Sequence, residues 1–297
     1  MSSYLLVLLG VVMVSYSGPL VKGGLLAGAN PASMAFTRML LSALMMLPLL
    51  CIRRKGQSEA PIRSLRRMTR TQWLWSLAAS GFLAVHYLTW MTSLDATSTF
   101  ASVALVCTQP LFVAAVSSLF LKERMPRQAI PGAIVALIGA GLIGLNSLTG
   151  MSGDIGGDLL ALAGAACMAG HWLCNRYARR TTEAEPFAFL LYAQTALLLL
   201  LTMPLTGGFQ MTGQSWLYAF GLAAGCTLLG HLMFTIALGK VSATVVSFAI
   251  LGEPVGAMLW SMLMFVEIPT PLLIIGGAVV LIGLTMYLLG SVKHQDS

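Results

Sequence analysis

Charged side chains are scarce in this chain. Only 9% of its 297 residues are Asp, Glu, Lys or Arg, whereas 57% are hydrophobic. Soluble domains carry about 25% charged residues, and a soluble fold of this length has no interior large enough for so much apolar surface. The net charge of +7 does not indicate nucleic-acid binding, because the basic residues lie between apolar runs and form no basic cluster on a folded, water-facing surface. The composition predicts an integral membrane protein with the lipid bilayer as its partner.

Motifs typical of metal sites and enzymes are also missing. The five cysteines form no CxxC pair, and no histidine lies at zinc-ligand spacing from them. Neither HExxH nor GxSxG occurs, which argues against an intramembrane enzyme. GxxxxGK[ST] is absent too, so ATP is not expected to drive a transport cycle directly. We expect no enzyme activity, no metal and no cofactor.

Long apolar runs occupy most of the sequence. A helix needs about 20 apolar residues to cross a hydrocarbon core of about 30 Å, and these runs are too evenly apolar for barrel strands. We predict an all-α integral membrane fold with ten transmembrane helices. The predicted spans are Tyr4–Val21, Ala32–Ile52, Trp73–Leu94, Phe100–Leu121, Ile130–Leu148, Leu159–Arg176, Phe187–Leu205, Trp216–Leu238, Ala243–Val266 and Leu272–Leu289.

The distribution of basic residues predicts the orientation. Most of the 17 Lys and Arg residues fall in connections on one side of the predicted membrane, which the positive-inside rule makes cytoplasmic. Both termini then face the cytoplasm. The run from Tyr4 to Val14 has no basic flank before it, so it is expected to be a retained first span. The polar segment from Arg53 to Arg70 has two interpretations, a topological anchor or a lipid-binding segment.

The sequence repeats itself at an offset of 144 positions. Each half, 1–148 and 149–297, contains five predicted spans, and an odd number places the second half in the membrane with the opposite orientation. One chain therefore holds both halves of an alternating-access transporter; a monomer is sufficient, and a dimer remains open. The matched pairs are Gly81 and Gly225, Leu88 and Leu232, Ser98 and Ser242, Pro110 and Pro254, Ser117 and Ser261, Leu119 and Leu263, Glu123 and Glu267, Gly132 and Gly276, and Gly139 and Gly283.

Three stretches resemble the EamA family of the drug/metabolite transporter superfamily. They are Ala35-Phe36-Thr37-Arg38, Gln109-Pro110 through Lys122-Glu123-Arg124, and Gly252-Glu253-Pro254 through Glu267. The resemblance covers nearly the whole chain and implies two five-helix repeats around a central cavity, export of amino acids or other metabolites, and a bacterial inner membrane. One departure is that Glu123 is followed by Arg124, whereas Glu267 is followed by Ile268.

Glu253 is the strongest candidate for a transport residue. It lies about 16 Å into the ninth span, close to the middle of the bilayer, where an ionisable group is costly. Pro254 interrupts the helix directly after it, and Gln109 with Pro110 occupies the matching point of the fourth span. Paired interruptions of this kind point to a transport site. The alternative is a structural Glu253 that binds a neighbouring helix; if it is functional, burial favours its protonated form and suggests the proton as coupling ion.

Other polar residues at mid-depth are further candidates. His86 shares a helix face with Trp90, and His171 shares one with Asn175, so each face offers a ring and a hydrogen-bond partner. The alternative, which is the more common role of a lone histidine in a membrane, is a structural hydrogen bond to another helix. Arg38 lies about 10 Å into the second span, where it either binds a substrate carboxylate, snorkels outward or pairs with an acid such as Asp95. His231 completes the candidates.

The favoured function is a secondary transporter that exports small metabolites such as amino acids. A multidrug or quaternary-cation proton antiporter is the alternative, because Tyr16, Trp90, Trp172 and Glu253 offer the parts of an aromatic cage. A membrane scaffold or receptor is disfavoured, since it has no need for costly polar groups at the midplane.

Overall fold

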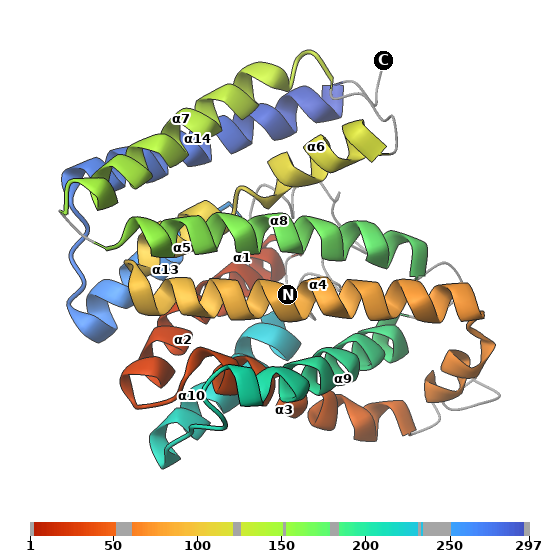
Figure 1. Ribbon diagram of the computed structural model, residues 1–297. Helices are drawn as coiled ribbons and strands as arrows, with labels where there is room; N and C mark the ends of the chain where they lie inside the picture. The colour runs from red at the N-terminus through yellow and green to blue at the C-terminus, as the bar shows by residue number, and fades with distance from the viewer. Residues whose placement is uncertain are drawn as a thin grey trace.

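The chain folds as a bundle of helices, shown in the computed structural model of Figure 1. The structure describes residues 3–51, 61–120, 126–150, 153–178, 184–230, 233 and 251–293, and these ranges contain helices and their connections but no strand. The helices are α1 (Ser3–Ser15), α2 (Ser17–Leu26), α3 (Pro31–Cys51), α4 (Arg70–Ala96), α5 (Thr99–Val106), α6 (Gln109–Phe120), α7 (Ile130–Leu148), α8 (Ile155–Ala178), α9 (Ala184–Thr202), α10 (Gly213–Gly221), α13 (Glu253–Phe265) and α14 (Pro271–Lys293), with 3-10 turns η1 (Pro61–Arg67) and η2 (Met203–Leu205) and a π-helix η3 (Leu222–Gly230).

Six helical stretches are long and apolar enough to cross a membrane: Leu5–Leu26, Thr99–Val116, Ile130–Leu148, Ile155–Asn175, Glu185–Leu205 and Pro271–Ser291. They lie at the predicted first, fourth, fifth, sixth, seventh and tenth spans. The second and third spans are the helices α3 and α4, and the eighth begins as α10 and continues as η3. The ninth is described only from Leu251 onward, so the count of ten spans stays a prediction.

Two of the predicted spans are broken rather than continuous. The first span divides into α1 and α2 at Tyr16, and this break was not predicted from the sequence. Its cause is Pro19, which has no N–H to donate to the carbonyl of Ser15 one turn earlier. The fourth span divides into α5 and α6 at Cys107 and Thr108, one turn before the ring of Pro110. The sixth span contains no proline and forms the unbroken α8.

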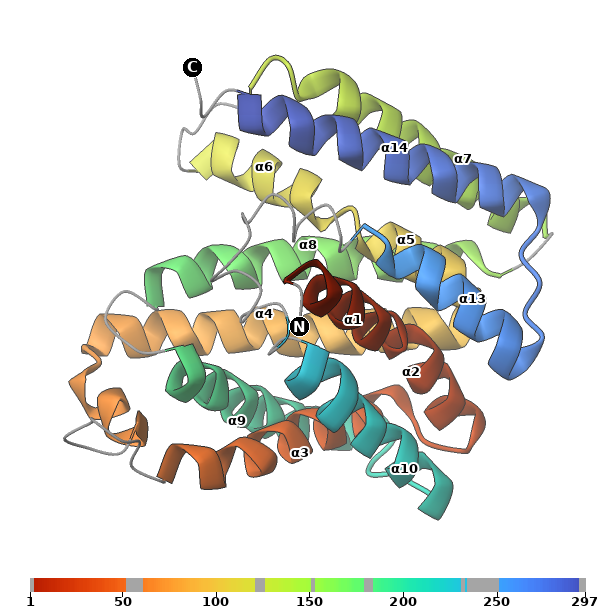
Figure 2. The same cartoon turned by 180° about the vertical axis from the view of Figure 1, so that it is seen from behind.

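The helices pack in an arrangement that is repeated between the two halves. The third-span helix α4 lies along the sixth-span helix α8, and the eighth-span elements α10 and η3 lie along the first-span helices α2 and α1. The second and seventh spans, α3 and α9, pack against each other, and α5 of the fourth span packs against α13 of the matching ninth span. Figures 1 and 2 show α7 and α14 side by side at one edge of the bundle, with α3, α9 and α10 at the opposite edge.

Glycines bring the backbones of α7 and α14 into contact. A Cβ on Gly132 would clash with the backbone of Gly283 and Tyr287, and one on Gly139 would clash with the backbone of Gly276 and Val280. Residues that come later in α7 contact residues that come earlier in α14, so the two helices run antiparallel. The repeat offset of 144 relates Gly132 to Gly276 and Gly139 to Gly283. It therefore converts the contact between Gly132 and Gly283 into the contact between Gly276 and Gly139. This interface between α7 and α14, the glycine seam, has two-fold symmetry.

Large apolar side chains cover the outward faces of several helices. Examples are Leu137 and Ile138 on α7, Ile282 on α14 and Leu201 on α9, all more than half exposed. Exposed apolar surface on this scale is unstable in water but is suited to lipid. The buried faces instead hold small residues and a substantial number of hydroxyl groups, among them Ser17, Thr37, Ser42, Ser80, Thr195 and Thr227.

The close packing at the glycine seam predicts how two glycine substitutions change the stability of the protein. Gly132→Ala should destabilise the protein by about 1–3 kcal/mol, because its methyl group has no room against the backbone of α14. Gly141→Ala, on the same helix with no atom within 4 Å of the added Cβ, should be neutral or slightly stabilising, because alanine favours helices. Thermal unfolding of the two purified variants in one detergent tests the difference; equal melting temperatures would contradict the seam.

Candidate functional site

Three helix starts lie in the interior of the bundle. Helix α2 begins at Ser17, α6 at Gln109 and α13 at Glu253, and the last two positions are related by the repeat offset. The first turn of any helix leaves N–H groups without intrahelical partners and carries partial positive charge. These helix starts therefore place backbone N–H groups in the interior of the bundle, where the middle of a helix leaves none without an intrahelical partner.

Arg38 is the buried charge of this region. Its side chain, on α3, is only 5% exposed. The guanidinium Nε donates to the hydroxyl of Thr227 at 3.0 Å, and Nη1 donates to the hydroxyl of Ser17 at 3.2 Å. Its Cζ lies 4.9 Å from the ring centroid of Tyr87, within the range of a cation–π contact. Arg38 therefore neither snorkels outward nor pairs with Asp95, which is exposed at the end of α4.

The π-helix presents one of the two hydroxyls to Arg38. Thr227, in η3, donates to the carbonyl of Leu222 at 3.0 Å, five residues earlier, and accepts from Arg38 through the same oxygen. A π-turn is rare, and π-turns occur frequently at functional sites. The corresponding part of α4 in the first half is regular α-helix, so this distortion belongs to one half only.

Glu253 faces the same interior. It is the first residue of α13, with Pro254 at the second position, and its side chain is half-buried. The carboxyl group is close enough to Arg38 for a charge interaction. The hydrogen-bond partners of Arg38 in the described chain are neutral hydroxyls, so Glu253 is its electrostatic counterpart at longer range. The structure thus brings together two of the residues that the sequence singled out.

Both described histidines bind backbone carbonyls on the neighbouring helix. Nδ1 of His86, on α4, lies 2.9 Å from the carbonyl oxygen of Gly164 on α8. Nδ1 of His171, on α8, lies 2.9 Å from the carbonyl oxygen of Ala79 on α4. The two contacts are reciprocal and hold α4 against α8, which is the structural role considered from the sequence.

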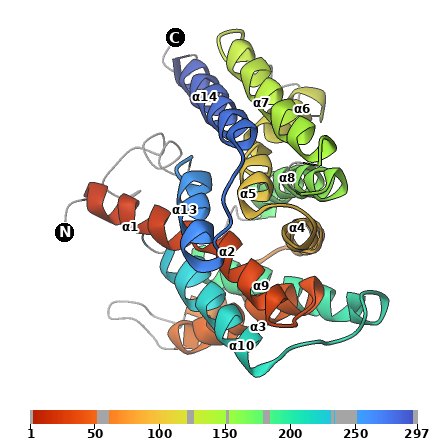
Figure 3. The ribbon, with the colours of Figure 1, turned by 90° about the vertical axis from the view of Figure 1, so that its left-hand side faces the viewer.

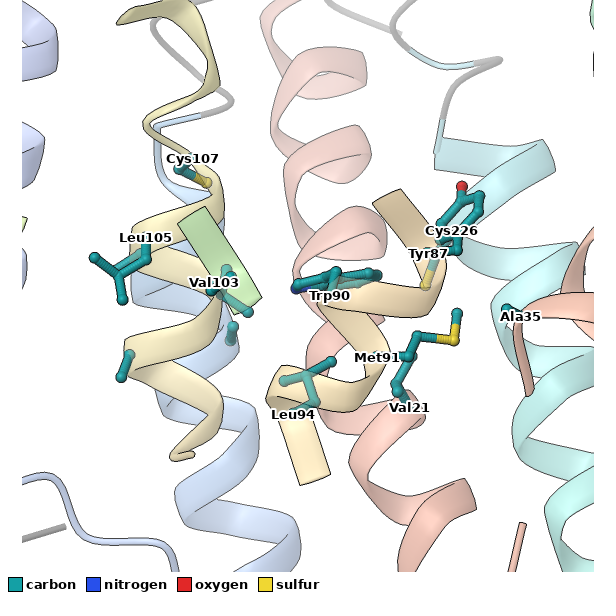
Figure 4. Close-up of a cluster of buried hydrophobic side chains, with 14 of the residues drawn as sticks. Val21, Ala35, Tyr87, Trp90, Met91, Leu94, Val103, Leu105, Cys107 and Cys226 are labelled. Carbon is teal, nitrogen blue, oxygen red and sulfur yellow. The ribbon is translucent and has the colours of Figure 1, made fainter. Parts of the chain in front are cut away.

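Trp90 lies at the centre of the buried cluster in Figure 4, between residues of α5 such as Val103 and residues such as Ala35 and Cys226. Its ring stacks on His86, with centroids 5.8 Å apart and an interplanar angle of 13°, as their shared helix face predicted. The indole N–H is buried and has no hydrogen-bond partner among the described residues. A buried donor of this kind is costly unless a water or a bound molecule satisfies it.

The remaining candidates are less closely connected. Gln109 and Pro110 are half-buried at the start of α6, and Asn175 is half-buried one turn beyond His171. His231 lies outside the described residues. The proposed cage does not assemble: Trp172 is 49% exposed on the outside of α8, and Tyr16 stacks on Trp260 with centroids 4.0 Å apart.

Sequence reasoning did not identify Ser17 or Thr227 as partners of Arg38. Pro19 was a usable signal for Ser17, because a proline within an apolar run predicts a helix break and exposed backbone groups near it. No signal marks Thr227, since π-helices have no sequence pattern comparable to a turn or cap.

Comparison with known proteins agrees with this architecture. The sequence pattern of the EamA-like transporter family matches twice, over residues 1–145 and 155–289. The chain belongs to the EamA-like transporter family. It is accordingly a multi-pass integral membrane protein built on two copies of one unit.

Solved structures share the fold. A crystal structure described only as that of a protein covers 100% of this chain and 99% of its own, with a TM-score of 0.63 and 17% sequence identity. At that identity the likeness establishes the fold alone. No match was found among curated proteins.

The contacts of the two histidines with backbone carbonyls predict that these residues contribute to stability. His171→Leu should lower the stability of the protein by about 1 kcal/mol, because the carbonyl of Ala79 loses its partner, while leaving transport activity largely intact. Trp172→Phe, the exposed neighbour, serves as the control and should change neither property. Loss of transport in His171→Leu at an unchanged melting temperature would instead make His171 a transport residue.

Proposed function

We propose that this EamA-like protein is a secondary transporter of ten spans that exports small metabolites, with amino acids as the first substrate class. The observation that carries the proposal is the pairing of the buried Arg38 with the half-buried Glu253, one from each half, where helix starts lie in the interior. A protein that only scaffolds a membrane has no need for such costly groups. Interrupted helices at mid-membrane are how secondary transporters expose backbone groups to substrates and ions.

The pair supports a substrate that bears opposite charges. The guanidinium of Arg38 has five N–H donors, and its two hydrogen bonds to hydroxyls leave donors for a substrate carboxylate. Glu253 offers a carboxylate to a substrate ammonium group or to a coupling proton. A zwitterion placed between them would satisfy both groups, which are too far apart for the direct hydrogen bonds of an ion pair.

Alternating access follows from the proposed symmetry. An axis that exchanges two antiparallel helices, as at the seam of α7 and α14, is perpendicular to both of them. If those helices cross the bilayer, the axis lies in the membrane plane and relates halves of opposite orientation. Each half can then adopt the conformation of the other, which opens the central site to one side and closes it to the other.

Glu253→Gln should abolish saturable counterflow of the substrate in proteoliposomes, because the neutral amide neither binds an ammonium group nor carries a proton. The panel should include labelled amino acids, nucleosides and organic cations, with and without an imposed pH gradient. Arg66→Gln, an exposed change far from the site, is the control and should leave counterflow intact. Full counterflow in Glu253→Gln would remove this residue from the mechanism; exchange restricted to organic cations would favour the antiporter alternative.

Arg38→Lys should reduce counterflow at least about tenfold although it preserves the charge. A lysine ammonium cannot reach Ser17 and Thr227 in the fork geometry while it stacks on Tyr87, and it cannot bind a carboxylate bidentately. Melting temperature measured beside counterflow separates the two effects. Wild-type counterflow in Arg38→Lys would show that only the charge matters.

A further inference from the structure

A cavity lined by charged side chains lies at one end of the bundle, and neither Arg38 nor Glu253 lines it. It has a volume of about 440 Å³, within the range of small-molecule sites. Its walls come from both halves: the middle of α2, the junction of α4 and α5, the second half of α13 and the start of α14. Figure 3 looks at this end of the molecule, which the distribution of basic residues predicts to be external.

Three charged side chains line this cavity: Lys22, Asp95 and Glu267. Lys22 donates from Nζ to the carbonyl of Leu94 at 2.6 Å, where a cation suits the C-terminal end of α4. Asp95 lies at that same end, where the helix dipole disfavours an acid, so helix stability does not explain its presence. The cavity therefore carries an excess of one negative charge in a protein whose overall charge is +7.

Glu267 is held in place by the backbone of the other half. One carboxylate oxygen, Oε1, accepts from the backbone N–H of Thr99 at 2.7 Å, at the start of α5. The chain reaches this position through Val266, which ends α13 with a positive φ of 56°. The second carboxylate oxygen of Glu267 has no such partner among the described residues, and the Glu267 residue lines the cavity.

Ser261 adds an unpaired polar group to the same wall. The residue is 1% exposed, and its hydroxyl has no hydrogen-bond partner within the described chain. A hydroxyl buried beside an empty volume gains a partner only from what enters that volume. This is a second indication, independent of the acids, that the cavity accommodates a ligand.

We propose that this cavity is a binding site for organic amines, with the ammonium group held by Glu267 and Asp95 and further contacted by the Ser261 hydroxyl. Two carboxylates and a hydroxyl supply acceptors for the three N–H donors of a primary ammonium. Lys22 lies where it would meet a carboxylate on the same ligand. A metal ion fits poorly, because the described residues contain no cluster of three metal-ligating side chains and Lys22 would repel a cation.

The repeat gives the site a counterpart. Ser117 and Glu123 stand 144 positions before Ser261 and Glu267, in the fourth span and the connection after it. The same polar pair is therefore encoded at the end of each matching helix, on opposite sides of the membrane if the halves are inverted. The site is independent of the central pair, so its existence does not require that the protein transports amines.

The test uses the purified full-length protein in nanodiscs and ligand-observed saturation-transfer NMR. The probes are butylamine, butyrate and 4-aminobutyrate, which separate the ammonium from the carboxylate. Butylamine and 4-aminobutyrate should bind saturably and butyrate should not. Tighter binding of 4-aminobutyrate than of butylamine would identify Lys22 as a carboxylate contact. Binding of butyrate as strong as that of butylamine would overturn the proposal.

Three variants locate the site. Glu267→Gln can still accept from Thr99 and should weaken butylamine binding about tenfold or more. Asp95→Asn, at an exposed position that keeps the fold, should weaken it as well. Ser261→Ala should weaken it about threefold without lowering the melting temperature, because the removed hydroxyl has no partner in the fold.

Two controls complete the design. Asp154→Asn removes an exposed acid at the same end of the molecule, outside the cavity, and should leave butylamine binding unchanged. An equal loss in Asp154→Asn and Glu267→Gln would show that only surface potential attracts the amine, and the proposal would fail. Counterflow in proteoliposomes is measured beside butylamine binding for Glu267→Gln, so failure of the transport proposal and failure of this one give different results.

Discussion

A guanidinium buried among neutral hydroxyls is the constraint on which the rest of this interior depends. A charge at this depth is tolerated only if its donors are satisfied and an opposite charge lies near. The structure meets both conditions through irregular helices: the break at Tyr16 releases Ser17, and the π-helix turns Thr227 toward Arg38. Glu253 supplies the opposite charge from the start of another half-helix. The irregularities of these helices therefore supply the hydrogen-bond acceptors that a buried guanidinium needs.

The two halves share their packing but not their chemistry. Three features of the packing follow the repeat. They are the glycine seam, the contact of α5 with α13, and the matching contacts of α4 with α8 and of α10 with α2. The break in the first span and the π-helix in the eighth have no counterparts in α8 and α4. Symmetric packing suits two interchangeable conformations, whereas a substrate with distinct ends is recognised by asymmetric side chains. The fold separates these two requirements between its periphery and its centre.

Much of the fold was predictable because lipid imposes simple rules on sequence. Apolar runs located the membrane helices, and Ile130–Leu148 was predicted to the residue. The family was predictable from motifs around Arg38, Gln109 and Glu253. The π-helix and the partners of Arg38 were not, because hydrogen bonds between distant spans depend on rotation and depth of each helix, which periodicity does not determine. The His86 and His171 contacts show the same limit: their helices were predicted, but not that each ring binds a backbone carbonyl.

Placing Arg38 in one half and Glu253 in the other has a consequence for stoichiometry. In an assembly of two identical chains, every residue beside the two-fold axis occurs twice, so a central site would contain two arginines and two glutamates. Covalent fusion of the halves lets each charge occur once. Under the proposed function, the site then holds a single polar molecule in one orientation, and neither end of that molecule meets a duplicate of the group that recognises the other.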